Sequence, residues 1–323
     1  MLTVYTAGPT CLKKEDPGTG LVDSPVWVDM VHPTSDEEAA VQRALKVELP
    51  TREEMQEIEI SSRLYRENGS LYMTATLLSN TDTENPEAKP ATFILSGDRL
   101  LTIRYTEPRP FRAFATRVQR VGGGFVRGDA VLVGLLDAIV DRTADILERI
   151  AADIDMISRD IFEYESKQPT KSRDFQDVLH RIGRKGDLNS KSRESLVSIG
   201  RLLAFLNQSL DVQKSGMDAK SRIDTLIHDV HALTDHATFL SNKINFLLDA
   251  TLGMINTEQN AIIKIFSVAA VAMMPPTLIA SIYGMNFKVM PELSFPFGYP
   301  LALLLMIGSA LLPWWYFKRR GWL

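Results

Sequence analysis

Hydrophobic and polar positions along the chain follow two different patterns, and the pattern changes near residue 108. Before it, short apolar runs alternate with polar turns, which is typical of a mixed α/β domain. Three early elements are expected: strands at 2–6 and 26–30 and a helix over 33–45. Thr34 or Ser35 is expected to cap that helix, because acidic residues fill the turn that follows them.

Two short turn signals predict β-hairpins in the same region. Asn68-Gly69 separates two strand-like runs, and Gly97-Asp98 does the same within residues 91–105. Both pairs suit tight turns that need a positive φ angle. The segment between the hairpins, residues 79–90, is polar and is expected to be a loop.

After residue 108, apolar residues recur every three or four positions, which predicts long helices. A glycine-rich connection at 121–130 comes first, and it lacks the Gly-Lys-Ser/Thr of a phosphate-binding loop. One helix then continues for more than thirty residues, and a second is expected over roughly 173–211. A third begins near 219 and has no breaker before Pro275. From 219 to 283 it would be on the order of 95 Å long, which suits a stalk that enters a membrane.

Two uncharged runs lie near the end of the chain, Ile265–Tyr283 and Leu293–Phe317. Each is long enough to cross about 30 Å of hydrocarbon as a helix. The predicted divisions are an aqueous domain at 1–260 and a membrane domain at 261–323, with spans at about 262–284 and 297–317. A pair of buried core helices is the alternative interpretation.

The last residues favour the membrane interpretation. Trp314, Trp315 and Tyr316 resemble an aromatic belt, and the basic residues 318–320 follow directly. Basic flanks stay on the cytoplasmic side of a membrane. Two spans therefore predict cytoplasmic N- and C-termini, and the loop at 284–296 is expected to face outward.

Charge divides in the same way as hydropathy. The chain has 323 residues with 36 Lys and Arg and 40 Asp and Glu. Five bases and one acid lie beyond residue 260, which leaves 31 bases and 39 acids before it. An acidic body with a basic, apolar tail argues against nucleic acid as a partner and favours the lipid bilayer. Cys11 is the one cysteine, so no intrachain disulfide is expected, and the first residues do not resemble a signal or transit peptide.

One face of the first predicted span is polar. Steps of four and three residues connect positions that share this face. They are Asp249, Asn256, Asn260, Ile263, Ser267, Ala270, Met274, Thr277 and Ser281. Helix packing through small residues would explain such a stripe, and so would the lining of a pore. Since one chain with two spans cannot enclose a pore, the second explanation requires several copies.

Under the pore interpretation the loop after the span forms its outer mouth. Gly284 is expected to end the helix, and Asn286 would form a ring of neutral amide carbonyls. Such a ring can accept hydrogen bonds from the waters of a hydrated Mg²⁺, which dehydrates reluctantly. Asp249 would form a negative ring at the cytosolic end. Pro275-Pro276, in the middle of the span, predicts a kink.

These residues resemble the CorA family of magnesium transporters. The resemblance rests on "YGMNF" at the end of the penultimate span, then "MPEL", "FGYP" and the terminal "YFKRRGWL". It covers about residues 258–323 at the level of motifs, and the order of elements before them also agrees. Two departures touch the pore helix: a second proline in "MMPPT", and Ser281 where glycine is common.

The resemblance implies an α+β cytosolic domain in α/β/α layers, very long helices and two transmembrane helices, assembled as a funnel-shaped homopentamer in a bacterial inner membrane. Gly284, Met285 and Asn286 would be the selectivity filter. The implied pore positions are Asp249, Asn260, Met274 and Thr277. Basic residues 318–320 would ring the stalk at the inner face of the membrane. Magnesium would be both the transported ion and a regulator that closes the pore from inside, with Asp224 as a candidate ligand of the regulatory site.

Other functions are weighed against this one. His228, His231 and His236 could hold zinc or another softer metal, although a solvated helix face also explains them. The family's alternative substrates are zinc, cobalt and nickel, and a membrane-anchored sensor without transport is a further alternative. No Ser/His/Asp arrangement or metalloprotease motif is present in the sequence, so an enzyme and an organic cofactor are not expected. Without an ATP site, an inside-negative potential of 100 mV still favours entry of a divalent ion by about 4.6 kcal/mol.

Overall fold

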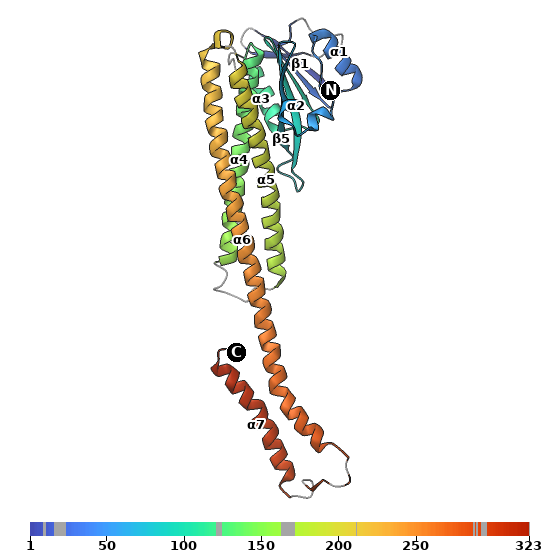
Figure 1. The fold of residues 1–323 in the computed structure, drawn as a ribbon, viewed down its shortest axis with the longest axis vertical. Coiled ribbons are helices and arrows are strands. Elements are labelled where there is room, and N and C mark those ends of the chain that lie inside the picture. The colour runs from blue at the N-terminus through green and yellow to red at the C-terminus, as the bar shows by residue number, and fades with distance from the viewer. Residues whose placement is uncertain are drawn as a thin grey trace. The chain divides into compact units, whose positions relative to one another are not determined.

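The computed structural model describes residues 1–8, 11–15, 24–120, 125–162, 172–210, 212–286, 288, 290–291 and 296–322. The chain divides into two units: Met1–Lys167 with Leu179–Leu247, and Gln168–Val178 with Leu248–Leu323. The first unit holds a β-sheet and long helices, and the second holds the apolar C-terminal segment (Figure 1).

The first unit contains a seven-stranded mixed sheet in the order β2-β1-β3-β7-β6-β5-β4. Its strands are β1 (Leu2–Ala7), β2 (Leu12–Glu15), β3 (Trp27–Val31), β4 (Leu64–Glu67), β5 (Ser70–Ser79), β6 (Glu87–Ser96) and β7 (Arg99–Arg104). β3 and β7 run parallel at its centre. Asn68 and Gly69 have φ angles of 48° and 79°, as a two-residue hairpin turn requires. The two predicted hairpins are thus confirmed.

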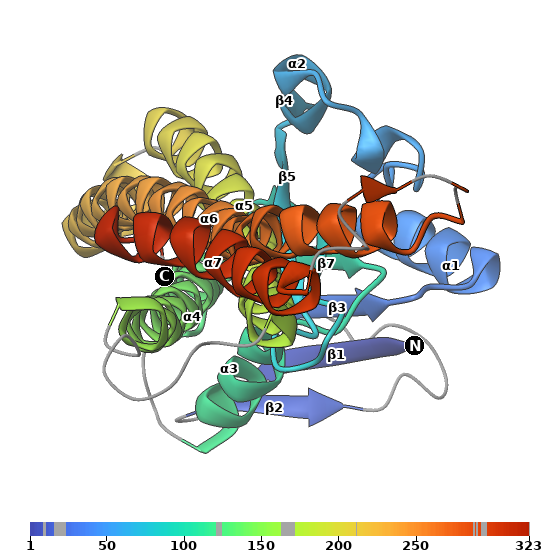
Figure 2. The same ribbon diagram turned by 90° about the horizontal axis from the view of Figure 1, so that it is seen from below.

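Helices cover both faces of the sheet, which confirms the predicted α/β/α layers. On one face lie the helices α1 (Ser35–Leu45), η1 (Glu54–Gln56) and α2 (Ile60–Arg63). Val41 of α1 and Met55 of η1 pack there against alternate sheet residues such as Val28 and Ile103. The other face carries α3 (Arg109–Arg120) and α4 (Gly128–Phe162). Figure 2 shows α1 and α4 on opposite sides of β3 and β7.

Thr34, one of the two predicted caps, closes the N-terminus of α1. Its hydroxyl accepts from the backbone N–H of Glu37, and the Glu37 carboxylate accepts from the Thr34 N–H. This reciprocal pair is a capping box, which satisfies two backbone donors that the helix itself cannot.

The polar segment between the hairpins is shorter than predicted. β5 extends to Ser79 and β6 begins at Glu87, so the connection covers only residues 80–86. Glu87 and Lys89 alternate with half-buried neighbours along β6, because a strand needs only one apolar face. β2, η1 and α2 were not expected at all, since three or four residues carry too little periodicity to be recognised.

A buried ion pair joins the two parallel strands at the centre of the sheet. The Arg104 guanidinium donates to both carboxylate oxygens of Asp29, at 3.1 and 2.8 Å, and both side chains are under 10% exposed. The Thr102 hydroxyl donates to the same carboxylate at 2.7 Å and accepts from the Trp27 indole at 3.0 Å. The Phe111 ring lies against the guanidinium, with its centroid 4.5 Å away. All polar groups of this cluster thus have partners, as burial requires.

Three long helices contribute to the rest of the first unit: α4, α5 (Ser172–Ser209) from Leu179 onward, and α6 (Val212–Tyr283) as far as Leu247. Buried Asn189 of α5 donates to the Ala237 carbonyl of α6 at 2.9 Å. On the other side of α5, Ser195 and Ser198 bond the backbone C=O and N–H of Thr76 in β5. β4 pairs only with the first residues of β5, so these serines satisfy a sheet edge that would otherwise be open.

The second unit contains the end of α6, beyond Leu247, and α7 (Gly298–Arg319). Both helices are long and apolar enough to cross a membrane, by length and composition, and almost none of their apolar residues are buried within the chain. Of the loop at 284–296, the residues Phe287, Val289 and Glu292–Phe295 lie outside the described part. The outward-facing loop predicted at 284–296 therefore stays a prediction, as does the first part of the uncharged run Leu293–Phe317.

Candidate functional site

The nine stripe positions all lie on α6, from Asp249 to Ser281. At about 100° per residue they fall within a sector of about 100° on a straight helix. Every one of them is exposed in the single chain. Apolar neighbours on other faces are exposed as well, for example Phe266 and Met273. The described residues of one chain therefore cover neither the polar face nor the apolar faces of this helix.

Backbone hydrogen bonding is interrupted in the middle of the predicted span. α6 continues through Pro275 and Pro276, neither of which has a backbone N–H to donate. The carbonyls of Val271 and Ala272 thus lose their usual helical partners. Directly after the prolines, the Thr277 hydroxyl donates to the Met273 carbonyl at 2.7 Å, and its oxygen keeps lone pairs for a further donor. A kink at the prolines stays a prediction.

The Gly-Met-Asn segment begins directly where α6 ends, at Tyr283. The Gly284 N–H still bonds the Ala280 carbonyl at 2.9 Å, and the Met285 N–H bonds the Ile282 carbonyl at 3.3 Å. A Cβ on Gly284 would lie 3.1 Å from the Ala280 oxygen. Here the glycine provides room beside a carbonyl; its φ is not among the positive values. Asn286 follows, exposed and outside the helix.

Asp224, the candidate regulatory ligand, lies on α6 in the first unit. Its carboxylate accepts from the Asn207 amide at 3.0 Å. His228 and His231 are exposed on the same helix, and His236 stacks on Phe239. Among the described residues no three His, Cys, Asp or Glu side chains are grouped so that they could hold a metal ion.

An acidic face on α4 was missed by the sequence reasoning. Asp137, Asp141 and Asp145 are spaced four residues apart on this helix, which places them along one side. Partial desolvation, followed by the Asp137 carboxylate, raises the pKa of Asp141, and Asp145 and Asp229 of α6 act in the same direction. Arginines offset part of this charge, since Arg222 lies 3.8 Å from Asp137, Arg142 lies 3.8 Å from Asp145, and Arg117 opposes the rise in the pKa of Asp141. The four-residue spacing is visible in the sequence and could have revealed this face.

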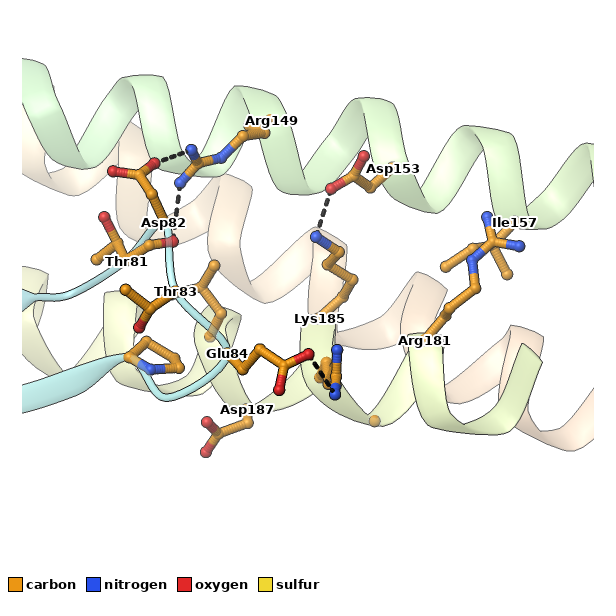
Figure 3. Close-up of a pocket in the computed structure, with 14 residues that line it drawn as sticks. Thr81, Asp82, Thr83, Glu84, Arg149, Asp153, Ile157, Arg181, Lys185 and Asp187 are labelled. Atoms are coloured by element: carbon orange, nitrogen blue, oxygen red, sulfur yellow. Dashed lines mark hydrogen bonds and ion pairs between the residues drawn. The ribbon is translucent and has the colours of Figure 1, made fainter. Parts of the chain in front are cut away.

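The first unit also has a cavity of about 770 Å³ beside the β5–β6 connection, α4 and α5. Figure 3 shows several charged side chains paired across the cavity, while Asp187 points away from the others. Asp153 pairs with Lys185, and Glu84 pairs with Arg184. Because each of these charges has an opposite partner, the cavity offers no excess charge to a ligand.

Asp82 is the most heavily paired residue of this cavity. It contacts Arg109 at 2.5 Å, Arg142 at 3.1 Å and also Arg149. The hydrogen bond from Arg149, and then the three positive charges, hold the pKa of Asp82 below its usual value. This cluster fastens the tip of the β5–β6 hairpin to α3 and α4.

Taken together, the α/β/α unit, the long helices and two apolar C-terminal helices define a membrane protein with a large aqueous domain. A family model described as CorA-like Mg2+ transporter protein matches residues 22–319. The chain belongs to this family, as the Gly-Met-Asn segment and its flanks predicted. Members of the family are ion transporters, which confirms that the chain is not an enzyme.

Individual relatives agree over the full length. The magnesium transport protein CorA of Pasteurella multocida is 33% identical over 324 residues, covering 100% of both chains. The magnesium transport protein CorA of Salmonella typhimurium is 35% identical over 305 residues, covering 94% of this chain and 93% of that protein. Among solved structures, the complete CorA magnesium transporter from Methanocaldococcus jannaschii has a TM-score of 0.76 at 18% identity, covering 100% of this chain and 99% of that one. At this identity the last likeness shows the fold.

Proposed function

We propose that this protein conducts Mg²⁺ passively into the cell through a pore on the axis of a homopentamer. Membership of the family and the names of its relatives support magnesium as the ion. The observation that carries the pore is the polar stripe on α6, which the chain leaves entirely exposed. In a membrane these polar side chains need protein or water around them. Five copies around an axis would provide both.

The proposed filter is the ring of Gly284, Met285 and Asn286 at the outer mouth. A hydrated Mg²⁺ presents the hydrogens of its waters, and neutral amide carbonyls can accept them without stripping the ion. Asn286 is exposed beyond the helix end, where its side chain is accessible to such an ion. Below it, the pore would be lined by Ser281, Thr277 and Met274, and further along the stripe by Ile263, Asn260, Asn256 and Asp249.

Closure by intracellular magnesium is part of the proposal. The aqueous domain has more acids than bases. On its acidic face on α4, burial and the neighbouring carboxylates raise the pKa of Asp141, and a bound divalent ion would reduce the repulsion between these carboxylates. Asp224 of one copy and carboxylates of the next copy would bind one ion together, and so would supply more ligands than one chain alone. Bound ions would hold the copies together and the pore closed. The basic end of α7 supports cytoplasmic termini, and the family resemblance supports an inner-membrane location.

The test measures Mg²⁺ uptake into vesicles that contain the purified full-length protein under an imposed inside-negative potential. Asn286→Ala removes the hydrogen bond to a charged, hydrated ion, so uptake should fall roughly tenfold or more. Asn85→Ala makes the same change on an exposed loop of the aqueous domain and should leave uptake unchanged. Equal uptake by both variants would contradict the filter assignment.

Competition on the same vesicles separates the substrates. Hexaammine cobalt mimics the hydrated ion without exchanging its ligands, so it should block the uptake of Mg²⁺. Stronger competition by Zn²⁺ or Ni²⁺ than by Mg²⁺ itself would favour the softer-metal branch of the family. An absence of flux for every divalent ion would support a membrane-anchored sensor instead.

A further inference from the structure

Three basic residues at the end of α7 each lie over an aromatic ring four residues earlier. Lys318 Nζ is 4.9 Å from the ring centre of Trp314, and the Arg319 guanidinium carbon is 4.9 Å from that of Trp315. The third pair repeats the arrangement, with Arg320 at 5.6 Å from the ring of Tyr316. The spacing of four places each pair on one side of the helix, one turn apart. The pairs together are named the C-terminal collar.

A helix cap holds the collar in shape. Gly321 has a φ of 71°, and its N–H bonds the Lys318 carbonyl at 3.2 Å. The Trp322 N–H bonds the Phe317 carbonyl at 3.1 Å. These two bonds form a Schellman motif, and the usual apolar contact accompanies them because Trp322 stacks on Phe317, with ring centres 5.2 Å apart. The basic residues thus belong to a capped helix end.

Among the described residues, no acidic side chain balances the positive charge of the collar. Glu292 is the last acidic residue, so residues 293–323 contain three basic side chains and no Asp or Glu. In the part of the chain that the structure describes, none of the ion pairs involves Lys318, Arg319 or Arg320. An aromatic face attracts a cation without neutralising it. The N–H groups along the edge of each guanidinium stay available to an acceptor.

The three cations point in different directions around the helix axis. Successive residues are about 100° apart, so the collar covers about 200° of the circumference. The rings beneath them are about half exposed: 45% for Trp314, 54% for Trp315 and 49% for Tyr316. A protein partner on one side of the helix could not face all three pairs. A layer of lipid headgroups surrounds a membrane helix and can face all of them.

We propose that the C-terminal collar is a binding site for anionic phospholipid headgroups. The phosphate accepts hydrogen bonds from the arginines and from Lys318, since Arg matches phosphate oxygens with two parallel donors. The glycerol and upper acyl carbons pack against the exposed indole faces, which prefer this depth of a bilayer. Phosphatidylcholine carries its own cation and competes poorly, because its net charge is zero.

Tryptophan fluorescence gives a direct test. Three of the four tryptophans lie at the collar, and the fourth, Trp27, is fully buried in the sheet. The full-length protein is placed in bilayers that contain brominated phosphatidylglycerol or brominated phosphatidylcholine as quencher. The collar should bind the anionic lipid preferentially, on the order of fivefold for each basic residue that engages it. The measurement reports lipid contact and not ion flux, so it is independent of the proposed transport function.

Charge and geometry are tested separately. The triple variant Lys318→Gln, Arg319→Gln and Arg320→Gln should bring the ratio of the two quenching efficiencies close to one. A matched control neutralises three exposed basic residues of the aqueous domain and should keep the wild-type ratio. Its substitutions are Lys13→Gln, Lys14→Gln and Arg43→Gln.

The cap variant keeps all three charges. Gly321→Ala strains a positive φ and should loosen the collar, lowering the preference by roughly twofold to threefold. Gly308→Ala lies inside α7 with open space around its Cβ and should change nothing. Wild-type protein without a preference for the anionic lipid, or a triple Gln variant that retains it, would overturn the proposal. A preference lost equally in the aqueous-domain control would do the same.

Discussion

Replacing Asp29 by Asn tests how the centre of the sheet is held together. The substitution keeps the shape and removes the charge, so the Arg104 guanidinium stays buried beside a neutral amide. Breaking a buried ion pair by changing one partner costs about 3–5 kcal/mol. The Thr106 carbonyl at 2.8 Å and the Phe111 ring still contact the guanidinium, and the Thr102 hydroxyl keeps a partner. We therefore expect the low end of this range, about 3 kcal/mol of lost unfolding free energy.

The assay is urea unfolding of the detergent-solubilised full-length protein, in a background where Trp27 is the only tryptophan. Trp27 reports the right region, since its indole donates to Thr102 beside the ion pair. The matched control is Asp98→Asn, which also separates an aspartate from an arginine. Asp98 lies 3.0 Å from Arg127 but is 67% exposed. The control should therefore cost less than about 1 kcal/mol.

A third variant distinguishes the ion pair from local packing. Asp29→Leu combined with Arg104→Met removes both charges and fills the space with apolar atoms, which is often nearly neutral for a buried pair. The double variant should be more stable than Asp29→Asn alone. If Asp29→Asn and Asp98→Asn cost the same, burial does not govern the energy of this pair. A double variant as unstable as the single one would show that the cost comes from shape and not from charge.

Two further predictions concern the first unit. Asp82→Asn leaves three arginines around a neutral side chain and should cost about 1–2 kcal/mol at pH 7. Because the folded pKa of Asp82 lies below its unfolded value, its contribution is present above about pH 4 and is lost as the pH falls through the folded pKa. Urea unfolding should therefore separate wild type from Asp82→Asn at pH 7, with a smaller gap below pH 4; a pH-independent gap would refute the electrostatic origin. Gly134→Ala places a Cβ 2.6 Å from the Phe125 ring and 2.9 Å from the Phe114 ring, so thermal unfolding should show a loss of about 1–3 kcal/mol. Gly183→Ala, in open space on α5, should instead gain up to about 1 kcal/mol, and equal effects of the two would contradict the packing argument.

Local signals in the sequence predicted local structure well. Asn68-Gly69 marks a hairpin because only a few residue types accept positive φ at both turn positions. The cap at Thr34 was predictable for a similar reason, since its partner Glu37 lies three residues away. The long helices were evident from apolar spacing alone. Each of these features depends on residues that are close in the chain.

Pairings between distant residues could not be predicted in this way. Asp29 and Arg104 are 75 positions apart, and periodicity identifies a buried face without identifying its partner. The connection after β5 was placed too widely because Glu87 and Lys89 are typical of loops, although they belong to a strand with one solvated face. For the candidate site, spacing predicted which residues share a face of α6. A single chain cannot test what that face surrounds, because assembly would decide it.

The two prolines of α6 have a consequence for how the membrane part folds. Their missing N–H groups leave the carbonyls of Val271 and Ala272 short of donors at the depth where lipid can offer none. In hydrocarbon, an isolated copy of this helix would leave these two carbonyls without hydrogen-bond donors, whatever its side chains are. Water, a neighbouring copy or a local tightening of the helix must supply the missing hydrogen bonds. In the proposed pentamer, backbone hydration as well as side-chain packing would then contribute to the free energy of assembly.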